Sequence, residues 1–199
     1  MAESDVQVCS NALLRIGADA ITALTDDNPR ARLMNALYRP TVDRLLRAHN
    51  WNFAQFRATL NEVATAPLWG FAHQFQLPQD PLCLMVLETT LTPDTPWRIE
   101  HWQNATASQS YRVIVTDDTA VSILYVGRLL DVTQWDPLFA YLVETDLAFQ
   151  ASYKIKGAYQ LTEMMKEELK EARLNAKAKD GQEGRHLKRW ASTILTDVR

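Results

Sequence analysis

The sequence predicts an α+β fold that is mainly α: a helical bundle, a small antiparallel β domain and an extended C-terminal tail. Apolar residues recur at helical spacing in residues 1–50 and again after residue 136. Between them, residues 82–126 hold short runs rich in β-branched and aromatic residues, which is typical of strands. The 199 residues, 47% of them hydrophobic and 23% charged, are enough to bury one sizeable core.

The first helix is predicted over residues 5–16. Ser4 and Gln7 form a Ser-x-x-Gln capping box at its start. Gly17 is expected to end it, because glycine adopts the left-handed conformation of a helix cap without steric cost. The residues that share its apolar face are Val6, Cys9, Leu13 and Ile16.

The second helix is predicted over residues 29–49. Asn28 is a capping residue, and Pro29 occupies the first helical position, where its missing N–H has no cost. Pro40 lies inside the helix and is expected to kink it or split it in two, because proline cannot donate the helical hydrogen bond.

The β-rich insertion is predicted over residues 82–126 as one small antiparallel sheet. Turn signals such as Asp117-Asp118 separate its short apolar runs. The polar segment HWQNATASQS, residues 101–110, is predicted to be a hairpin loop that projects from the distal edge of this sheet.

Two further helices are predicted over residues 137–156 and 158–178. Asp136, followed by proline, caps the first of them, and Gly157 separates the two. The last helix carries Glu/Lys pairs at helical spacing, interpreted as a solvated face.

The stretch WGFAHQFQLPQD, residues 69–80, is interpreted as packing and not as a cleft or a catalytic loop. Its aromatic side chains are expected to anchor the connection between the helices and the sheet, since each buries roughly 150–250 Å². Pro78 and Asp80 are expected to set the turn into the next strand. The residues predicted to pack in the core or between subunits are Trp51, Phe53, Trp69, Phe71, Phe75, Pro78 and Trp135.

Motifs for catalysis and cofactor binding are not found. The six glycines are too far apart for a dinucleotide-binding or Walker loop, and the four histidines are scattered. Cys9 and Cys83 stand alone, which favours buried reduced thiols over a disulfide or a metal site. Adjacent acids such as Asp26-Asp27 favour turn roles. We therefore predict no enzyme, no cofactor and no metal, although a carboxylate pair assembled across the fold stays open.

Charge and hydropathy favour a soluble protein made in a cytoplasm, with no membrane partner. The N-terminus lacks the basic region and continuous apolar core of a signal peptide, and no window approaches the roughly 20 apolar residues of a membrane span. The net charge is −3, with +3 on residues 177–199 and therefore −6 on residues 1–176.

Several blocks of the chain, taken in order, resemble the tail tubular protein A family. These proteins are the head-to-tail adaptors of short-tailed phages, with relatives in other tailed phages. The matching blocks are RAHNWNFAQFRATL, WGFAHQFQLPQDPLCLMVLE, WRIE, the Asp117-Asp118 turn, VSILYVGRLLDVTQWDPLFAYLV and the charged final helix. Pro40 is a departure from the family pattern, because a proline at this position is not expected in a straight second helix.

The resemblance implies a structural virion protein of the neck and tail, present in the host cytoplasm during assembly. It implies a dodecameric ring between the portal and the tail nozzle, with double-stranded DNA passing through the bore without sequence-specific binding. The β domain would lie toward the tail. Six tryptophans and six tyrosines suit subunit interfaces, and an acidic body suits a bore that does not grip DNA.

Two docking segments complete the prediction. A single adaptor domain spans residues 1–179, and residues 180–199 form a tail that orders against the portal, the alternative being a frayed end without function. Asp180-Gly181 is expected to interrupt the final helix. The tail residues predicted to dock are Arg185, Leu187, Lys188, Arg189, Trp190, Ile194 and Leu195. The loop residues predicted to face the nozzle are His101, Trp102, Gln103, Asn104 and Gln109.

Two other functions stay open from the sequence. One is a cell-wall hydrolase carried in the virion, with acids gathered from distant segments. The other is a small DNA-binding helical protein, although the basic residues cluster in the tail and not on a recognition helix.

Overall fold

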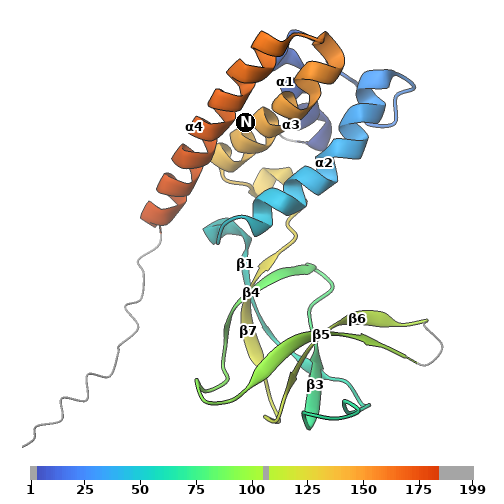
Figure 1. Ribbon diagram of the computed structural model, residues 1–199, viewed down its shortest axis with the longest axis vertical. Coiled ribbons are helices and arrows are strands. Elements are labelled where there is room, and N and C mark those ends of the chain that lie inside the picture. Colours follow the sequence, from blue (N-terminus) through green and yellow to red (C-terminus); the bar gives the residue numbers. More distant parts are fainter. Residues whose placement is uncertain (1–3, 105–107, 184–199) are drawn as a thin grey trace, which may run out of the picture.

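The computed structural model describes residues 4–104 and 108–183 and places a helical bundle and a β domain one above the other along the long axis (Figure 1). The α+β, mainly α fold predicted from the sequence is confirmed. The helices of the bundle are α1 (Asp5–Arg15), α2 (Pro29–Arg47), α3 (Pro137–Lys156) and α4 (Tyr159–Glu183). The chain passes between the two parts after α2 and again before α3, at the short 3-10 helices η1 (Asn52–Ala54) and η2 (Val132–Gln134).

The helix boundaries follow from the capping residues. Ser4, Asn28 and Asp136 each accept a backbone N–H from the first turn of α1, α2 and α3, at 2.8 to 3.2 Å. Gly157 ends α3 in the left-handed conformation, with φ of +63°. Helix α2 runs unbroken through Pro40, so the predicted split does not occur.

The β domain contains two antiparallel sheets and begins earlier than predicted. Its strands are β1 (Gln55–Thr59), β2 (Asn61–Glu62), β3 (His73–Gln76), β4 (Cys83–Thr89), β5 (Trp97–Gln103), β6 (Ser110–Thr116) and β7 (Ser122–Gly127). The strand orders are β1-β7-β4 and β2-β3-β6-β5. The predicted start at residue 82 and the single sheet were therefore wrong. The first three strands are short, and each pairs with a neighbour: β1 with β7, β2 with β3, and β3 with β6.

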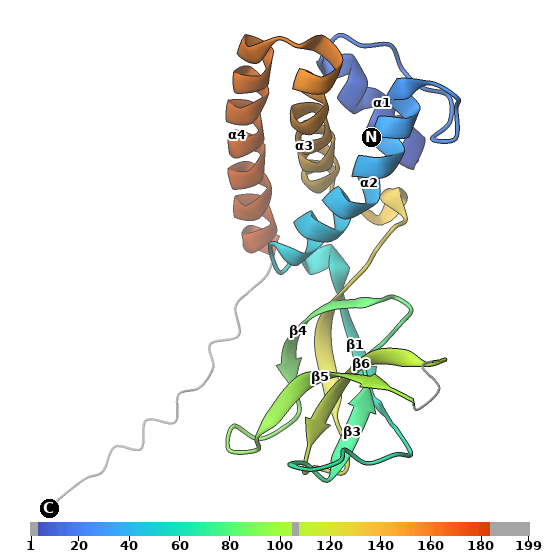
Figure 2. The ribbon, with the colours of Figure 1, turned by 45° about the vertical axis from the view of Figure 1, so that its right-hand side comes forward.

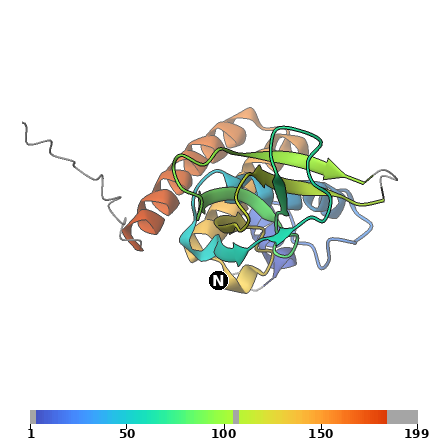
Figure 3. The same ribbon diagram turned by 90° about the horizontal axis from the view of Figure 1, so that it is seen from below.

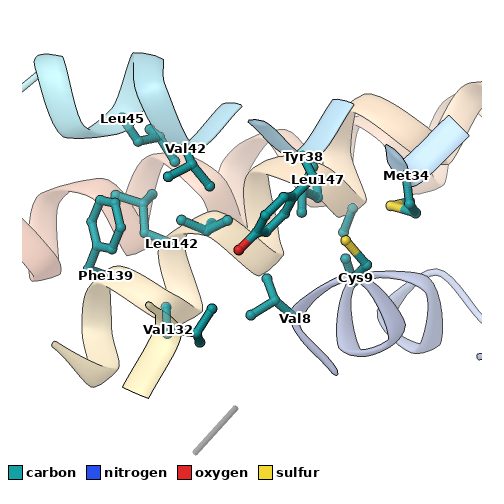
Figure 4. Close-up of a cluster of buried hydrophobic side chains, with 14 of the residues drawn as sticks. Val8, Cys9, Met34, Tyr38, Val42, Leu45, Val132, Phe139, Leu142 and Leu147 are labelled. Carbon is teal, nitrogen blue, oxygen red and sulfur yellow. The ribbon is translucent and has the colours of Figure 1, made fainter. Parts of the chain in front are cut away.

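Helix α3 is the centre of the bundle and packs against the other three helices (Figure 2). Figure 4 shows its Phe139, Leu142 and Leu147 beside Val42 of α2 and Val8 of α1. All five side chains are buried, which makes one continuous core. A second core lies inside the β domain and is formed by Leu60, Phe75, Leu77, Cys83, Ile114, Val121, Ile123 and Tyr125.

Cys9 and Cys83 are both buried and free, as predicted, and belong to different cores. Burial raises the pKa of the Cys9 thiol to about 12, and it also raises the pKa of Cys83. Because the thiolate is the reactive form, we expect neither thiol to react quickly with a disulfide reagent at pH 8. The same reagent in denaturant should titrate both. Rapid stoichiometric labelling of the native protein would show that a thiol is accessible.

Candidate interaction surfaces

The aromatic junction between the helical bundle and the β domain is formed by Trp51, Phe53, Trp135 and Phe139. Both tryptophans are buried, and their ring centroids lie 5.0 and 5.1 Å from that of Phe139. Phe53 is half-buried, with its ring centroid 5.0 Å from the same ring. These residues come from the two connecting segments and from the start of α3, so they hold both crossings of the chain together. The predicted packing role of Trp51, Phe53 and Trp135 is confirmed.

The stretch from residue 69 to 80 does not form this junction, contrary to the prediction. Trp69 is 85% exposed in the segment between β2 and β3, whereas Phe75 is buried in the β core. Phe71 and Pro78 are half-buried. Phe75 lies in β3, which pairs with β6, and this position brings its side chain into the β core. The expected turn after Pro78 is present: its carbonyl accepts the N–H of Cys83 at 3.0 Å.

The C-terminal end of α4 is anchored at the same junction. The carboxylate of Asp180 accepts the backbone N–H of Asn52 at 2.8 Å and lies 2.8 Å from Nε2 of His49. The side-chain amide of Asn52 donates to the Asp180 carbonyl at 2.6 Å. Asp180 is 8% exposed, and α4 continues through Gly181 to Glu183. The predicted helix end at residue 178 and tail start at 180 were wrong, because these tertiary contacts override the turn preference of Asp-Gly.

Replacing Asp180 with alanine should lower the free energy of unfolding by about 1–2 kcal/mol, since water can reach Asn52 and replace part of the lost bonding. The amides of the last turn of α4 should then exchange hydrogen faster. Glu183→Ala, at an exposed position three residues on, is the control and should change the stability by less than about 0.5 kcal/mol. Equal stability of the two variants would contradict the anchoring role.

The tail residues predicted to dock on the portal lie outside the described part of the chain. They are Arg185, Leu187, Lys188, Arg189, Trp190, Ile194 and Leu195. Their role stays a prediction.

The predicted nozzle-facing loop is mostly strand. His101, Trp102 and Gln103 belong to β5, and the Trp102 ring stacks on Tyr111 of β6 with centroids 4.7 Å apart. The side chain of Asn104 accepts the N–H of Gln109 at 3.2 Å and closes the hairpin. Strands β5 and β6 run out to one side of the β domain, so the hairpin points across the long axis and not along it (Figure 3).

Two carboxylates of α3 are buried and paired with arginines. Asp146 lies 2.8 Å from Arg44 of α2 and 3.8 Å from Arg173 of α4. Glu144 lies 3.4 Å from Arg15 of α1. Residues two apart on a helix point about 200° apart, so Glu144 and Asp146 face opposite sides of α3. These two acids therefore tie the bundle together and do not act as a pair on one substrate.

The charges of α4, interpreted from the sequence as one solvated face, form two surfaces in the structure. The basic surface consists of Arg44 and Arg47 of α2 with Lys170, Arg173 and Lys177 of α4. The acidic surface consists of Glu163, Glu167, Glu168 and Glu171 of α4, around a depression of about 560 Å³. The recurrence of glutamates at 163, 167 and 171 was the available signal for the acidic surface.

A depression of about 280 Å³ lies over β1, β4 and β7. The charged side chains that line it are Arg57 and Glu88. Within residues 4–104 and 108–183, no three His, Cys, Asp or Glu side chains are grouped as metal ligands. Every helix in the same ranges is too short or too polar to cross a lipid bilayer.

No protein-family model matches this chain, and a search of curated proteins finds no match either.

Proposed function

We propose that this protein is a structural virion protein of the tail tubular protein A type, a head-to-tail adaptor that joins the portal to the tail nozzle. The observation that carries the proposal is the ordered set of sequence blocks, RAHNWNFAQFRATL through VSILYVGRLLDVTQWDPLFAYLV. The arrangement of the molecule supports it. A helical bundle and a β domain lie at opposite ends of one long axis, so a single subunit presents different surfaces to two partners (Figure 2).

The aromatic junction supports the role of a connector that transmits force between the helical bundle and the β domain. Trp51 and Trp135 each donate their indole N–H to a backbone carbonyl, of Leu45 and Leu129, at 2.9 Å. Buried aromatic rings with satisfied polar atoms pack in few orientations. The two ends of the subunit are therefore coupled through a packed connection and not through an open linker.

The position of the end of α4 is compatible with a tail that reaches the portal. Asp180 fixes this end beside the junction, and residues 184–199 follow Glu183. An extended chain of that length spans about 53 Å. The 25 residues of α4 span only about 38 Å, so the tail is long enough to pass the far end of the bundle.

The β domain offers two candidate contacts for the nozzle. The hairpin of β5 and β6 projects sideways, whereas the segment between β2 and β3 lies at the end farthest from the helices (Figure 1). Leu68 and Trp69 of that segment are 101% and 85% exposed. Large exposed apolar side chains at one tip are typical of interaction sites.

Replacing residues 104–109 with Asn-Gly should leave ring assembly intact and abolish nozzle attachment. Gln103 already pairs with Ser110, so a two-residue turn joins the strands without changing their register. Nozzle recruitment by particles that carry the variant is the measurement. If recruitment is normal, the hairpin is only a connector, and the segment around Trp69 becomes the candidate.

Ordered addition of purified components tests the function itself. Portal rings should bind this protein in the absence of nozzle protein, and nozzle protein should bind portal rings only after this protein has been added. Nozzle protein that binds bare portals equally well would contradict an adaptor role. Loss of peptidoglycan turbidity with the purified protein would favour the hydrolase, and a salt-dependent shift of duplex DNA would favour the DNA-binding protein.

A further inference from the structure

We infer that the basic and acidic surfaces of the helical bundle are the two halves of the contact between neighbouring copies of this chain. The acidic surface of one copy would lie on the basic surface of the next. This inference rests on the proposed ring function. It adds which surfaces of neighbouring subunits contact each other.

The basic surface is a row of cations from α2 and α4, two helices that both pack on α3. Arg44 and Arg173 converge on the buried Asp146, yet their side chains remain 51% and 44% exposed. One turn further along α4, Lys177 donates to the carbonyl of Ala48, the residue that follows Arg47, at 3.3 Å. Asp146 is buried and neutralises only part of the charge of these cations. The exposed side of the basic surface therefore keeps a net positive charge.

The acidic surface carries both charge and exposed apolar area. Met164 is 61% exposed among the glutamates, and its side chain lines the depression. Glu163 and Glu167 have lysine partners one turn away, and Glu168 pairs with Arg15. Glu171 forms no ion pair or hydrogen bond with any residue in the described ranges. An apolar centre surrounded by partly unpaired charges is typical of a protein–protein interface.

The two surfaces adjoin on the outer face of α4, where Lys170 of the basic surface lies 3.8 Å from Glu167 of the acidic surface. Asp146 lies beneath the basic surface, whereas Glu144 points to the other side of α3, where Arg15 links it to Glu168 of the acidic surface. A two-fold dimer that pairs each surface with itself would place like charges together, and the ring function proposed above selects the head-to-tail arrangement. A head-to-tail contact pairs opposite charges at every step, and such contacts close into rings.

Duplex DNA is another anion that a basic surface attracts, but the structure favours a second copy of this chain. The acidic surface lies on the same helix, α4, and repels phosphates that approach along it. A second copy of this chain carries the complement of both surfaces.

Charge reversal with rescue by mixing tests this contact. Arg47→Glu changes the basic surface, and Glu171→Lys changes the acidic surface; neither residue has an ion-pair partner in the described ranges. Each variant alone should associate about tenfold or more weakly than the wild type, because like charges then meet. An equimolar mixture should regain association, since alternating copies present opposite charges and a dodecamer has an even number of copies.

Arg39→Glu is the matched control. Arg39 is exposed on α2 but points about 140° away from Arg44, outside the basic surface. It should associate like the wild type. Sedimentation at low and high salt gives the mass of each species, and unchanged thermal unfolding shows that each variant is folded.

Each outcome decides for or against the contact. Rescue by mixing, with weaker wild-type association at high salt, supports it. Wild-type rings from either single variant, or a mixture that stays dissociated, would overturn the inference and leave the adaptor function standing. Loss of duplex DNA binding by Arg47→Glu with unchanged mass would assign the basic surface to DNA. A wild type that forms no ring, alone or on portal rings, would overturn the proposed function as well.

Discussion

Replacing Trp51 with alanine is expected to lower the free energy of unfolding by about 3–5 kcal/mol, the range for removing a buried aromatic side chain. Trp51 is 1% exposed, and its ring lies between those of His49 and Phe139, at centroid distances of 4.7 and 5.0 Å. The substitution also removes the hydrogen bond from the indole N–H to Leu45. For a chain of this size the midpoint of thermal unfolding should fall by roughly 6–20 °C.

Trp69→Ala is the matched control, because it removes the same side chain from a position that is 85% exposed. Its free energy of unfolding should change by no more than about 0.5 kcal/mol. Denaturant unfolding of both variants measures the difference directly. A loss below about 1 kcal/mol for Trp51→Ala would show that the junction is not a packed connection.

Truncation after Glu183 is expected to abolish portal docking while the fold persists. The cut keeps Asp180, and therefore keeps the bonds to Asn52 that hold the end of α4. A cut after Lys179 would remove this anchor and confuse a loss of docking with a loss of stability. The deleted residues 184–199 include the predicted contacts Arg185 and Trp190.

Binding of the truncated chain to portal rings, measured beside its thermal unfolding, checks this prediction. Trp190→Ala in the full-length chain is the companion variant, because it removes a large apolar side chain without shortening the tail. Hydrogen exchange of residues 184–199 should slow when the full-length protein binds portal rings. Wild-type docking by the truncated chain would refute a portal-docking tail.

The starts of α1, α2 and α3 were predictable because they depend on neighbouring residues. Ser4, Asn28 and Asp136 cap the turns that begin directly after them, so a few consecutive positions suffice. Strand β1 was missed although QFRAT alternates polar and apolar residues, which is typical of a strand. It pairs with β7, on the far side of the β domain in sequence. Asp180 was misassigned because its partner, Asn52, is distant in the sequence.

The candidate surfaces were predictable only in part. Aromatic content indicated that large side chains must be buried, but not which ones, so Trp51 and Trp69 received the same role. Phe139 distinguishes them, because only Trp51 reaches it in the fold. The basic surface combines α2 with α4, and no local pattern places Arg44 beside Arg173.

The mass of the purified protein, alone and mixed with portal rings, tests the adaptor role most directly. Sedimentation or native mass spectrometry gives the number of copies in each species. The predicted result is a ring, formed either in free solution or on contact with the portal, with the dodecamer that the resemblance implies. A monomer that stays a monomer and does not bind portal rings would contradict the proposed function.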